Sequence, residues 1–152
     1  MMGLTDKVGQ DLISAMKAGD GPRLSVLRLL RTRLKEVQIE KRRELSDDEF
    51  YKVVMSEVAK RKEAIELFDR GGRKDLSTRE LKEIEILETY LPPRLSEEEI
   101  KALVADAIKE VGAKSPNDLG KVMKIVMPKV TGRAEGSLVS KIVRELLAEA
   151  KD

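Results

Sequence analysis

Apolar residues recur along most of the chain with the spacing of an amphipathic helix. Within residues 24–42, the apolar positions fall three or four residues apart, with polar and basic residues between them. These positions are Val26, Leu27, Leu30, Leu34 and Val37. Their period matches the roughly 3.6 residues per turn of an α-helix and not the period of about two that a half-buried strand shows. The pattern predicts an all-α protein.

Residues that start and end helices divide this pattern into separate elements. A Ser followed three residues later by Glu satisfies free N–H groups at a helix start, whereas Gly and Pro end helices. The expected helices run from about Thr5 to Ala18, from Pro22 to Arg42, from the capping box at Ser46 to Arg70, and from near Arg73 or Leu76 to Tyr90.

The third and fourth of these helices carry apolar stripes and oppositely charged pairs. Their predicted core residues are Val54, Val58, Ile65, Phe68, Leu81, Ile84, Leu87 and Leu91. Glu57 and Arg61 lie four residues apart, a spacing that favours a surface ion pair worth roughly 0.2–0.5 kcal/mol. We expect this pair to lie in solvent and to contribute to solubility.

The proline pair after Leu91 is the strongest candidate for a domain boundary. Pro lacks a backbone donor and disfavours helix at the residue before it. Beyond this point, Ser96 to Glu99 form a second capping box, and we expect a helix from Ile100 to Val111 that Gly112 ends. The predicted organisation is a helical domain of about four helices over residues 1–94 and a small three-helix domain over residues 95–152.

The last two predicted helices form a basic hairpin. Ser115 as an N-cap and Pro116 at the first helical position predict where it begins. Its predicted apolar stripes are Leu119, Val122, Met123, Val126 and Val130, then Val139, Ile142, Val143, Leu146 and Ala150. Its basic residues lie opposite these stripes or at the connecting turn, and they are Lys121, Lys124, Lys129, Arg133, Lys141 and Arg144. We call these six residues and the helices that carry them the basic hairpin.

Two interpretations of the basic hairpin stay open. Lys and Arg can neutralise backbone phosphates without reading bases, so the hairpin is a candidate surface for a polyanion. Lysines opposite an apolar stripe are also what a solvated helix shows. The scarcity of carboxylates within the hairpin favours the first interpretation.

A second basic face is predicted in the first half of the chain. Residues 22–43 hold eight basic and two acidic side chains, whereas residues 44–110 hold twelve and eighteen. Four of the basic residues fall within about 60° of one another on their helix. They are Arg28, Arg31, Lys35 and Arg42, and we call them the second basic face. We favour a solvated surface here over an anion site, because nearby acidic helices can neutralise it.

The composition narrows the chemistry. The chain has 152 residues with 30 basic and 28 acidic side chains, and it has no Cys, His or Trp. A structural zinc site of the usual kind and catalysis by a Ser-His or Cys-His pair are therefore excluded. We expect no catalytic residues, metal or cofactor. The absence of a long apolar run and of a signal-peptide core predicts a cytoplasmic protein with no membrane partner.

Several stretches, taken in order, resemble the YqeY family. They are LSVLRLLRTRLK, SEVAKRKEAIELFDRGGRKDL, EIEILETYLPPRLSEEEI and GKVMKIVMPKVTGRAEGSLVSKIV, and together they extend over nearly the whole chain. This family comprises free-standing bacterial proteins related to the tail region of GatB, the B subunit of the glutamine-dependent aminoacyl-tRNA amidotransferase. The resemblance implies a helical N-terminal domain and a three-helix C-terminal domain like the end of that tail.

The resemblance also implies a partner. The GatB tail helps to hold the body of the tRNA while transamidation occurs in other domains and in a partner subunit. Lys121, Lys129, Arg133 and Lys141 lie within matching motifs, so they inherit the hypothesis of RNA contact. The second basic face lies outside the segment where the likeness to the tail is clearest and inherits it less firmly.

Three classes of function stay open. The family resemblance suggests carbon–nitrogen ligase activity with glutamine as amide donor. That chemistry needs an activated nucleophile and a nucleotide-phosphate site, and this chain has no Cys, His or Walker loop. We favour a noncatalytic tRNA-binding or tRNA-associated accessory protein. The alternatives are a helical adaptor that docks on an amidotransferase or an aminoacyl-tRNA synthetase and, least favoured, a self-sufficient enzyme.

Overall fold

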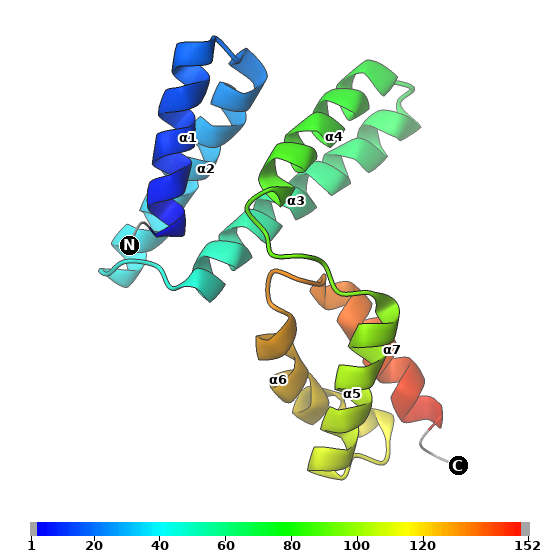
Figure 1. Cartoon of the computed structure of the whole chain (residues 1–152). Coiled ribbons are helices and arrows are strands. Elements are labelled where there is room, and N and C mark those ends of the chain that lie inside the picture. The colour runs from blue at the N-terminus through cyan, green and yellow to red at the C-terminus, as the bar shows by residue number, and fades with distance from the viewer. Residues whose placement is uncertain (1–2, 150–152) are drawn as a thin grey trace. The chain divides into compact units, whose positions relative to one another are not determined.

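The computed structural model describes residues 3–149, and every regular element within that range is a helix (Figure 1). The all-α prediction is confirmed. In chain order the elements are α1 (Leu4–Ala18), α2 (Gly21–Lys41), α3 (Asp47–Arg70), α4 (Lys74–Glu88), α5 (Glu97–Val111), the 3₁₀ turn η1 (Pro116–Asp118), α6 (Leu119–Val130) and α7 (Gly136–Glu149).

The chain divides into two compact units, each with its own hydrophobic core. We call Met1–Leu91 the N-terminal unit and Pro92–Asp152 the C-terminal unit. The division falls within the Leu91-Pro92-Pro93 segment, where proline leaves the backbone unable to continue a helix.

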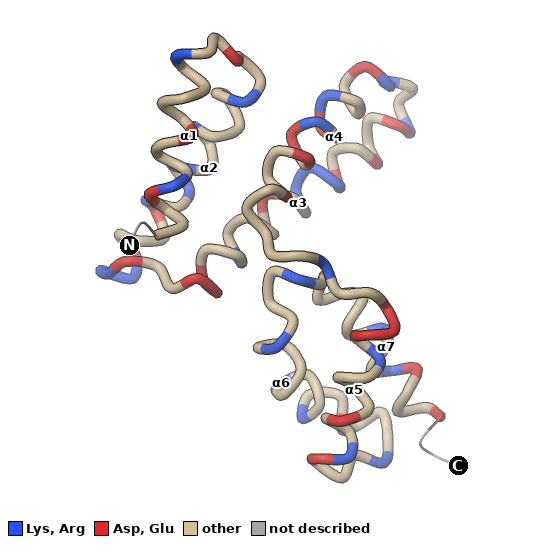
Figure 2. The backbone as a smooth tube through the Cα atoms, in the orientation of Figure 1, with Lys and Arg blue, Asp and Glu red and all other residues tan. Residues whose placement is uncertain are grey.

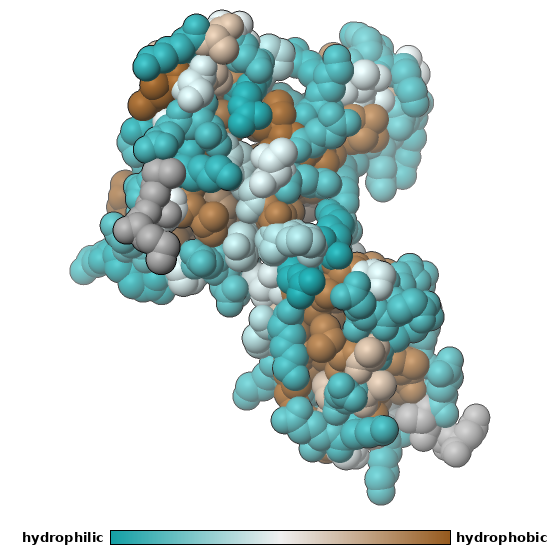
Figure 3. Space-filling view, in the orientation of Figure 1, coloured by the Kyte–Doolittle hydropathy of each residue, from teal (hydrophilic) through white to brown (hydrophobic). Residues whose placement is uncertain are grey.

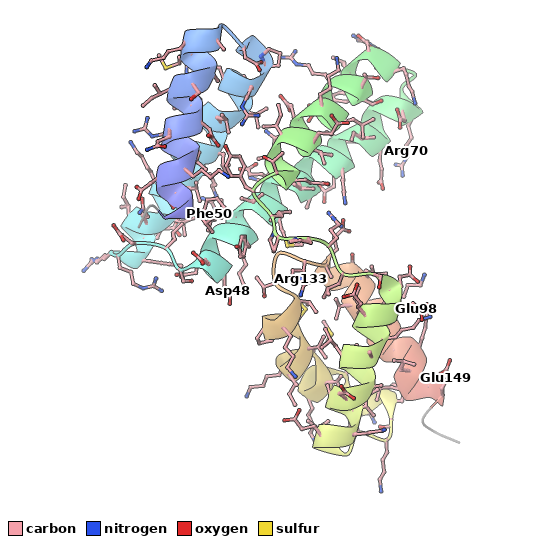
Figure 4. All side chains as sticks on the ribbon, in the orientation of Figure 1. Asp48, Phe50, Arg70, Glu98, Arg133 and Glu149 are labelled. Atoms are coloured by element: carbon pink, nitrogen blue, oxygen red, sulfur yellow. The ribbon has the colours of Figure 1, made fainter. Side chains whose placement is uncertain are left out.

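The N-terminal unit consists of two helical hairpins, α1 with α2 and α3 with α4, which share one core (Figure 1). The four apolar residues of α2 that are fully buried, Val26, Leu27, Leu30 and Leu34, were all predicted. Phe50 was not, although it is only 1% exposed. Phe50 lies at the start of α3, where Figure 4 labels it. Its ring packs edge-on against the ring of Tyr51 and against that of Tyr90, which follows α4. The predicted capping box also forms, since the Ser46 hydroxyl accepts from the Glu49 N–H at 3.2 Å.

Two predictions for α4 are wrong. The helix ends at Glu88 and not at Tyr90, which instead turns into the core and donates its hydroxyl to the Asp11 carboxylate. Leu81 is 48% exposed. The buried side of α4 centres on Ser77, Ile84 and Leu87, which leaves Leu81 at the edge of the apolar stripe.

The predicted Glu57–Arg61 pair forms, but not in solvent. Arg61 is only 8% exposed. Its Nη1 lies 3.3 Å from Glu57 Oε2, and its Nε lies 3.1 Å from Glu83 Oε2 and 4.0 Å from Glu80 Oε2. Burial, followed by the charge of Glu83, raises the pKa of Glu80. Arg61 therefore joins α3 to α4 within a group of carboxylates, and the expected role in solubility was wrong.

The C-terminal unit is a three-helix arrangement in which α5, α6 and α7 each pack against the other two. The predicted stripes are largely correct. Val122, Val126, Val130, Val139, Ile142 and Val143 are buried. Leu147 is fully buried in place of Leu146, which is only partly so, and Ala150 lies outside the described residues.

The start of the basic hairpin differs from the prediction. Ser115 makes no side-chain cap, and the 3₁₀ turn separates it from α6. The Asp118 carboxylate instead accepts the Lys114 N–H at 3.0 Å. None of the helices within residues 3–149 combines the length and the apolar composition that crossing a bilayer requires.

Candidate nucleic-acid interface

The amphipathic character of α6 and α7 directs most of their basic side chains outward. Their buried valines and isoleucine face the shared core, and Lys121, Lys124, Lys141 and Arg144 are exposed on the opposite sides of the two helices. Figure 2 shows these basic positions along both helices. Because each helix also packs against α5, the outward sides of α6 and α7 point in different directions. The surface therefore has two cationic faces, one on each helix.

Among residues 3–149, Lys121 is the one member of those four with a carboxylate beside it. Its Nζ lies 3.7 Å from Asp118 Oδ1, and 72% of its side chain is exposed. The pKa of Asp118 is lowered, first by the Lys114 N–H and to a smaller extent by the charge of Lys121. Asp118 thus partly neutralises Lys121, a pairing that the scarcity of carboxylates in the hairpin did not suggest.

Arg133 has a structural role at the turn between α6 and α7, where Figure 4 labels it. Its Nε donates to the Pro93 carbonyl at 3.1 Å. Its own carbonyl accepts the Leu95 N–H at 2.9 Å. Its charge also adds to the effect of the Ser96 N–H and hydroxyl, which lower the pKa of Glu99. Arg133 therefore fixes the segment before α5 against the turn and is only partly available to a ligand.

Two acidic groups near the turn and the start of α5 are engaged with other partners. Glu135, in the turn, lies 3.7 Å from Arg94 Nη1. Glu99 caps α5 by accepting the Ser96 N–H at 3.2 Å, and the first turn of α5 is acidic (Figure 2). Among residues 3–149, Glu99 forms no ion pair with a lysine of α6 or with a cation of α7.

Four cations of the basic hairpin are exposed and have no ion pair with any residue between 3 and 149. They are Lys124, Lys129, Lys141 and Arg144. An unpaired exposed cation keeps its full charge for a ligand and releases counterions when a phosphate binds. These four residues, which we call the unpaired set, are the centre of the candidate interface.

The second basic face belongs to the N-terminal unit. Arg28, Arg31, Lys35 and Arg42 are all exposed along α2 and at its end. Within residues 3–149, no group of three or more acidic side chains is arranged to hold a metal ion. The carboxylates around Arg61 instead surround a guanidinium.

Comparison with known proteins gives one consistent result. A family model described as Yqey-like protein matches residues 5–147. A relative in Pyrenophora tritici-repentis (strain Pt-1C-BFP), named "Altered inheritance of mitochondria protein 41, mitochondrial", is 28% identical over 142 residues, which cover 90% of this chain and 77% of the relative.

Two proteins with the same name are similar over shorter segments. The one in Lachancea thermotolerans is 33% identical over 111 residues, covering 71% of this chain and 59% of the relative. The one in Kluyveromyces lactis is 32% identical over 111 residues, covering 71% and 60%. In these two alignments, the chain spans about three-fifths of the relative's length. The shared name states no ligand or reaction.

Proposed function

The chain belongs to the Yqey-like family, and we propose that it is a noncatalytic tRNA-associated protein whose basic hairpin contacts the phosphate backbone of tRNA. The observation that carries this proposal is the unpaired set, four exposed cations on one helical hairpin with no ion pair among residues 3–149. In an ordinary solvated face, cations and carboxylates are interspersed. That contrast is carried by α6, which has no acidic residue, whereas α7 also exposes Glu145 and Glu149.

The aromatic residues favour contact with the backbone over contact with bases. The chain has two Phe and two Tyr, and all four precede the C-terminal unit. Proteins that hold unpaired bases usually stack them on aromatic side chains. A surface of Lys and Arg alone positions a nucleic acid through its phosphates, with little preference for sequence.

We assign any amide transfer linked to this protein to a partner. The chain contains no Cys or His, so the usual nucleophile-and-base pairs for releasing ammonia from glutamine cannot form. The link to a glutamine-dependent amidotransferase rests on the family resemblance. A cytoplasmic location stays a prediction, since the relatives are named as mitochondrial proteins.

The test is a salt titration of binding to unfractionated tRNA. The four phosphate contacts of the unpaired set should contribute about −3 to the slope of log K against log salt, and each contact removed should reduce the slope by about 0.7–0.9. Lys124→Gln with Lys129→Gln should therefore reduce it by about 1.5, as should Lys141→Gln with Arg144→Gln.

A matched control removes two positive charges from the third helix of the same unit. Lys101→Gln with Lys109→Gln changes the net charge equally, but these exposed lysines lie on α5 near its acidic residues. We expect the slope to stay near the wild-type value. An equal loss in the control would indicate diffuse attraction, and tRNA binding without salt dependence would overturn the proposal.

A second candidate is an adaptor that docks on an amidotransferase or an aminoacyl-tRNA synthetase. It is favoured by large apolar side chains exposed on the N-terminal unit, among them Ile13 at 53% and Met16 at 55% (Figure 3). Nuclease treatment distinguishes the two candidates. A complex with such an enzyme that persists after the RNA is digested supports the adaptor, whereas one that is lost supports association through tRNA.

A further inference from the structure

The eight basic residues between positions 22 and 43 separate into two sets. Four of them lie beside a carboxylate: Arg23 at 3.9 Å from Asp11, Arg33 at 3.0 Å from Glu36, and Lys41 and Arg43 at 2.8 Å and 2.6 Å from Glu49. The other four are the second basic face, and none of them has an ion pair among residues 3–149. The nearby acids therefore neutralise Arg23, Arg33, Lys41 and Arg43 and leave the second basic face charged.

The charges are also separated around the axis of α2. Arg28, Arg31 and Lys35 fall within about 60° of one another on α2, whereas Glu36 and Glu40 lie toward a different side. Along the helix these three cations extend over about 10 Å, at 1.5 Å per residue, and Arg42 follows where the helix ends. They form a line of charge and not a single point, which suits an extended chain of phosphates.

A shallow groove between α1 and α2 runs beside this line. Arg31, Lys35 and Gln38 line it from α2. The residues that line it from α1 are Thr5, Asp6, Gly9, Gln10 and Ile13. Gly9 belongs to this wall, and no atom outside its own helix lies within 4 Å of where its Cβ would be. The one carboxylate in the groove, Asp6, already accepts the Gly3 N–H at 3.3 Å. The groove thus offers cations, amides and a hydroxyl to an anion, beside the apolar side chain of Ile13.

Arg42 provides an independent observation. Among the described residues it is the one non-glycine residue with a positive φ, at 56°. It occupies the left-handed position that ends α2, and its N–H donates to the Ile39 carbonyl at 3.3 Å. Gly adopts this conformation without the steric cost that any Cβ brings. The backbone therefore favours Gly here, and the presence of Arg points to a use for its side chain.

We propose that the second basic face is a second surface of this protein for the phosphate backbone of RNA. The inference rests on the proposed function, because it takes the same class of ligand. Three of its four cations are Arg, whose forked donors match two phosphate oxygens at once. Ile13 lines the groove with Arg31 and Lys35, and Ile39 lies beside Lys35 and Arg42. An anionic lipid surface is therefore the alternative ligand that the test must separate from RNA.

The test uses the full chain, unfractionated tRNA and a control on the same helix. Arg31→Gln and Arg33→Gln each remove one positive charge, and the two sites lie two positions apart on α2. Arg33 is paired with Glu36, whereas Arg31 has no ion pair among residues 3–149. Arg31→Gln should reduce the salt slope by about 0.7–0.9 and Arg33→Gln should leave it unchanged. Arg42→Gly should reduce the slope by a similar amount without lowering the midpoint of thermal unfolding.

Each outcome has a defined meaning. Equal losses for Arg31→Gln and Arg33→Gln, or no loss for Arg31→Gln and Arg42→Gly, overturn the second surface. If substitutions in the unpaired set still reduce the salt slope in that case, the proposed function is supported and only the second surface is rejected. If only the variants of α2 weaken binding, the second surface stands and the hairpin proposal fails. Binding of these residues to vesicles of anionic lipid in preference to tRNA would also overturn the inference, and wild type without salt-dependent tRNA binding overturns both.

Discussion

The α3–α4 hairpin and the α6–α7 hairpin both carry cations on amphipathic helices, yet their cations have different surroundings. Arg61 is 8% exposed and lies within 4.0 Å of three carboxylates. Lys124 and Lys141 are exposed and have no ion pair among residues 3–149. The same residue class therefore contributes to the stability of one hairpin and to the available charge of the other, and only the tertiary neighbours distinguish the two roles.

This difference also explains why net charge is a poor guide to this molecule. The whole chain carries a formal charge of +2. Carboxylates neutralise part of each basic segment and leave the rest free, as Asp118 does for Lys121 and Glu36 does for Arg33. Salt screens exposed charges that lie more than about 10 Å apart. A bound ligand is therefore attracted mainly by the unpaired cations that it contacts, and not by the net charge of the chain.

The largest expected effect comes from removing the buried cation. Arg61→Met should lower the free energy of unfolding of the N-terminal unit by roughly 3 kcal/mol, because it leaves carboxylates close together without their cation. Chemical denaturation followed by circular dichroism measures the change. Arg79→Met, which removes an exposed cation from α4, is the control and should shift unfolding by less than about 0.5 kcal/mol.

The pH dependence of that variant sharpens the comparison. Burial and the charge of Glu83 already raise the pKa of Glu80 above its usual value. A carboxyl group with a raised pKa in the folded state destabilises the fold as it ionises, so the cost falls when the pH is lowered. The deficit of Arg61→Met should shrink between pH 7 and about pH 5. A deficit that is constant with pH would show that lost packing, and not repulsion, causes it.

A smaller loss is expected at the end of α4. Tyr90→Phe removes the hydrogen bond from the Tyr90 hydroxyl to Asp11 and should cost about 1 kcal/mol. Burial, with the hydrogen bond to Asp11, raises the pKa of Tyr90. Because the neutral form is favoured in the fold, this stabilisation is present below the unfolded pKa of about 10 and is lost at higher pH. Phenolate absorbance of a Tyr51→Phe protein reports Tyr90 alone, and its ionisation should coincide with alkaline unfolding.

Within the basic hairpin, substitutions of Arg133 and Lys129 should have different effects on stability, because Arg133 holds the turn and Lys129 does not. Arg133→Gln removes the hydrogen bond to the Pro93 carbonyl and should lower the unfolding free energy of the C-terminal unit by up to about 1 kcal/mol. Lys129→Gln should change it by less than about 0.5 kcal/mol. Thermal unfolding checks both. Equal destabilisation would contradict the distinction between a cation that holds the turn and one that is free.

The smallest expected change is a gain at the end of α2. Arg42→Gly relieves the left-handed conformation of a residue with a Cβ, at φ 56°, but it also increases the freedom of the unfolded chain. The net effect should be between zero and about 1 kcal/mol of stabilisation. Destabilisation measured by denaturant titration would show that the Arg42 side chain contributes to the fold, which would remove one argument for its role in binding.

Local sequence predicted the helices well because their signals are local. The capping boxes at Ser46 and Ser96 form as expected, since each needs only residues three positions apart. The buried position of Arg61 was missed because Glu80 and Glu83 come from the next helix, about twenty positions away. The burial of Phe50 was missed because it depends on contact with the Tyr90 ring, forty positions later in the chain, which the residues around Phe50 do not indicate.

The candidate site was predicted at the level of its residues but not of their roles. Periodicity indicated that basic side chains oppose the apolar stripes of the hairpin, and they are exposed there. It does not distinguish Arg133, tied to Pro93, from Lys124, which has no partner among residues 3–149. That distinction depends on a contact between positions forty residues apart, which no helical period encodes.

The most direct test of the central claim compares the salt dependence of tRNA binding in the wild type and in a protein with Lys124, Lys129, Lys141 and Arg144 all replaced by Gln. If unpaired cations make the interface, the slope should fall by about 3 while the thermal midpoint stays the same. An unchanged slope in a folded variant, or an equal fall when four cations that have ion pairs are replaced instead, would contradict the claim.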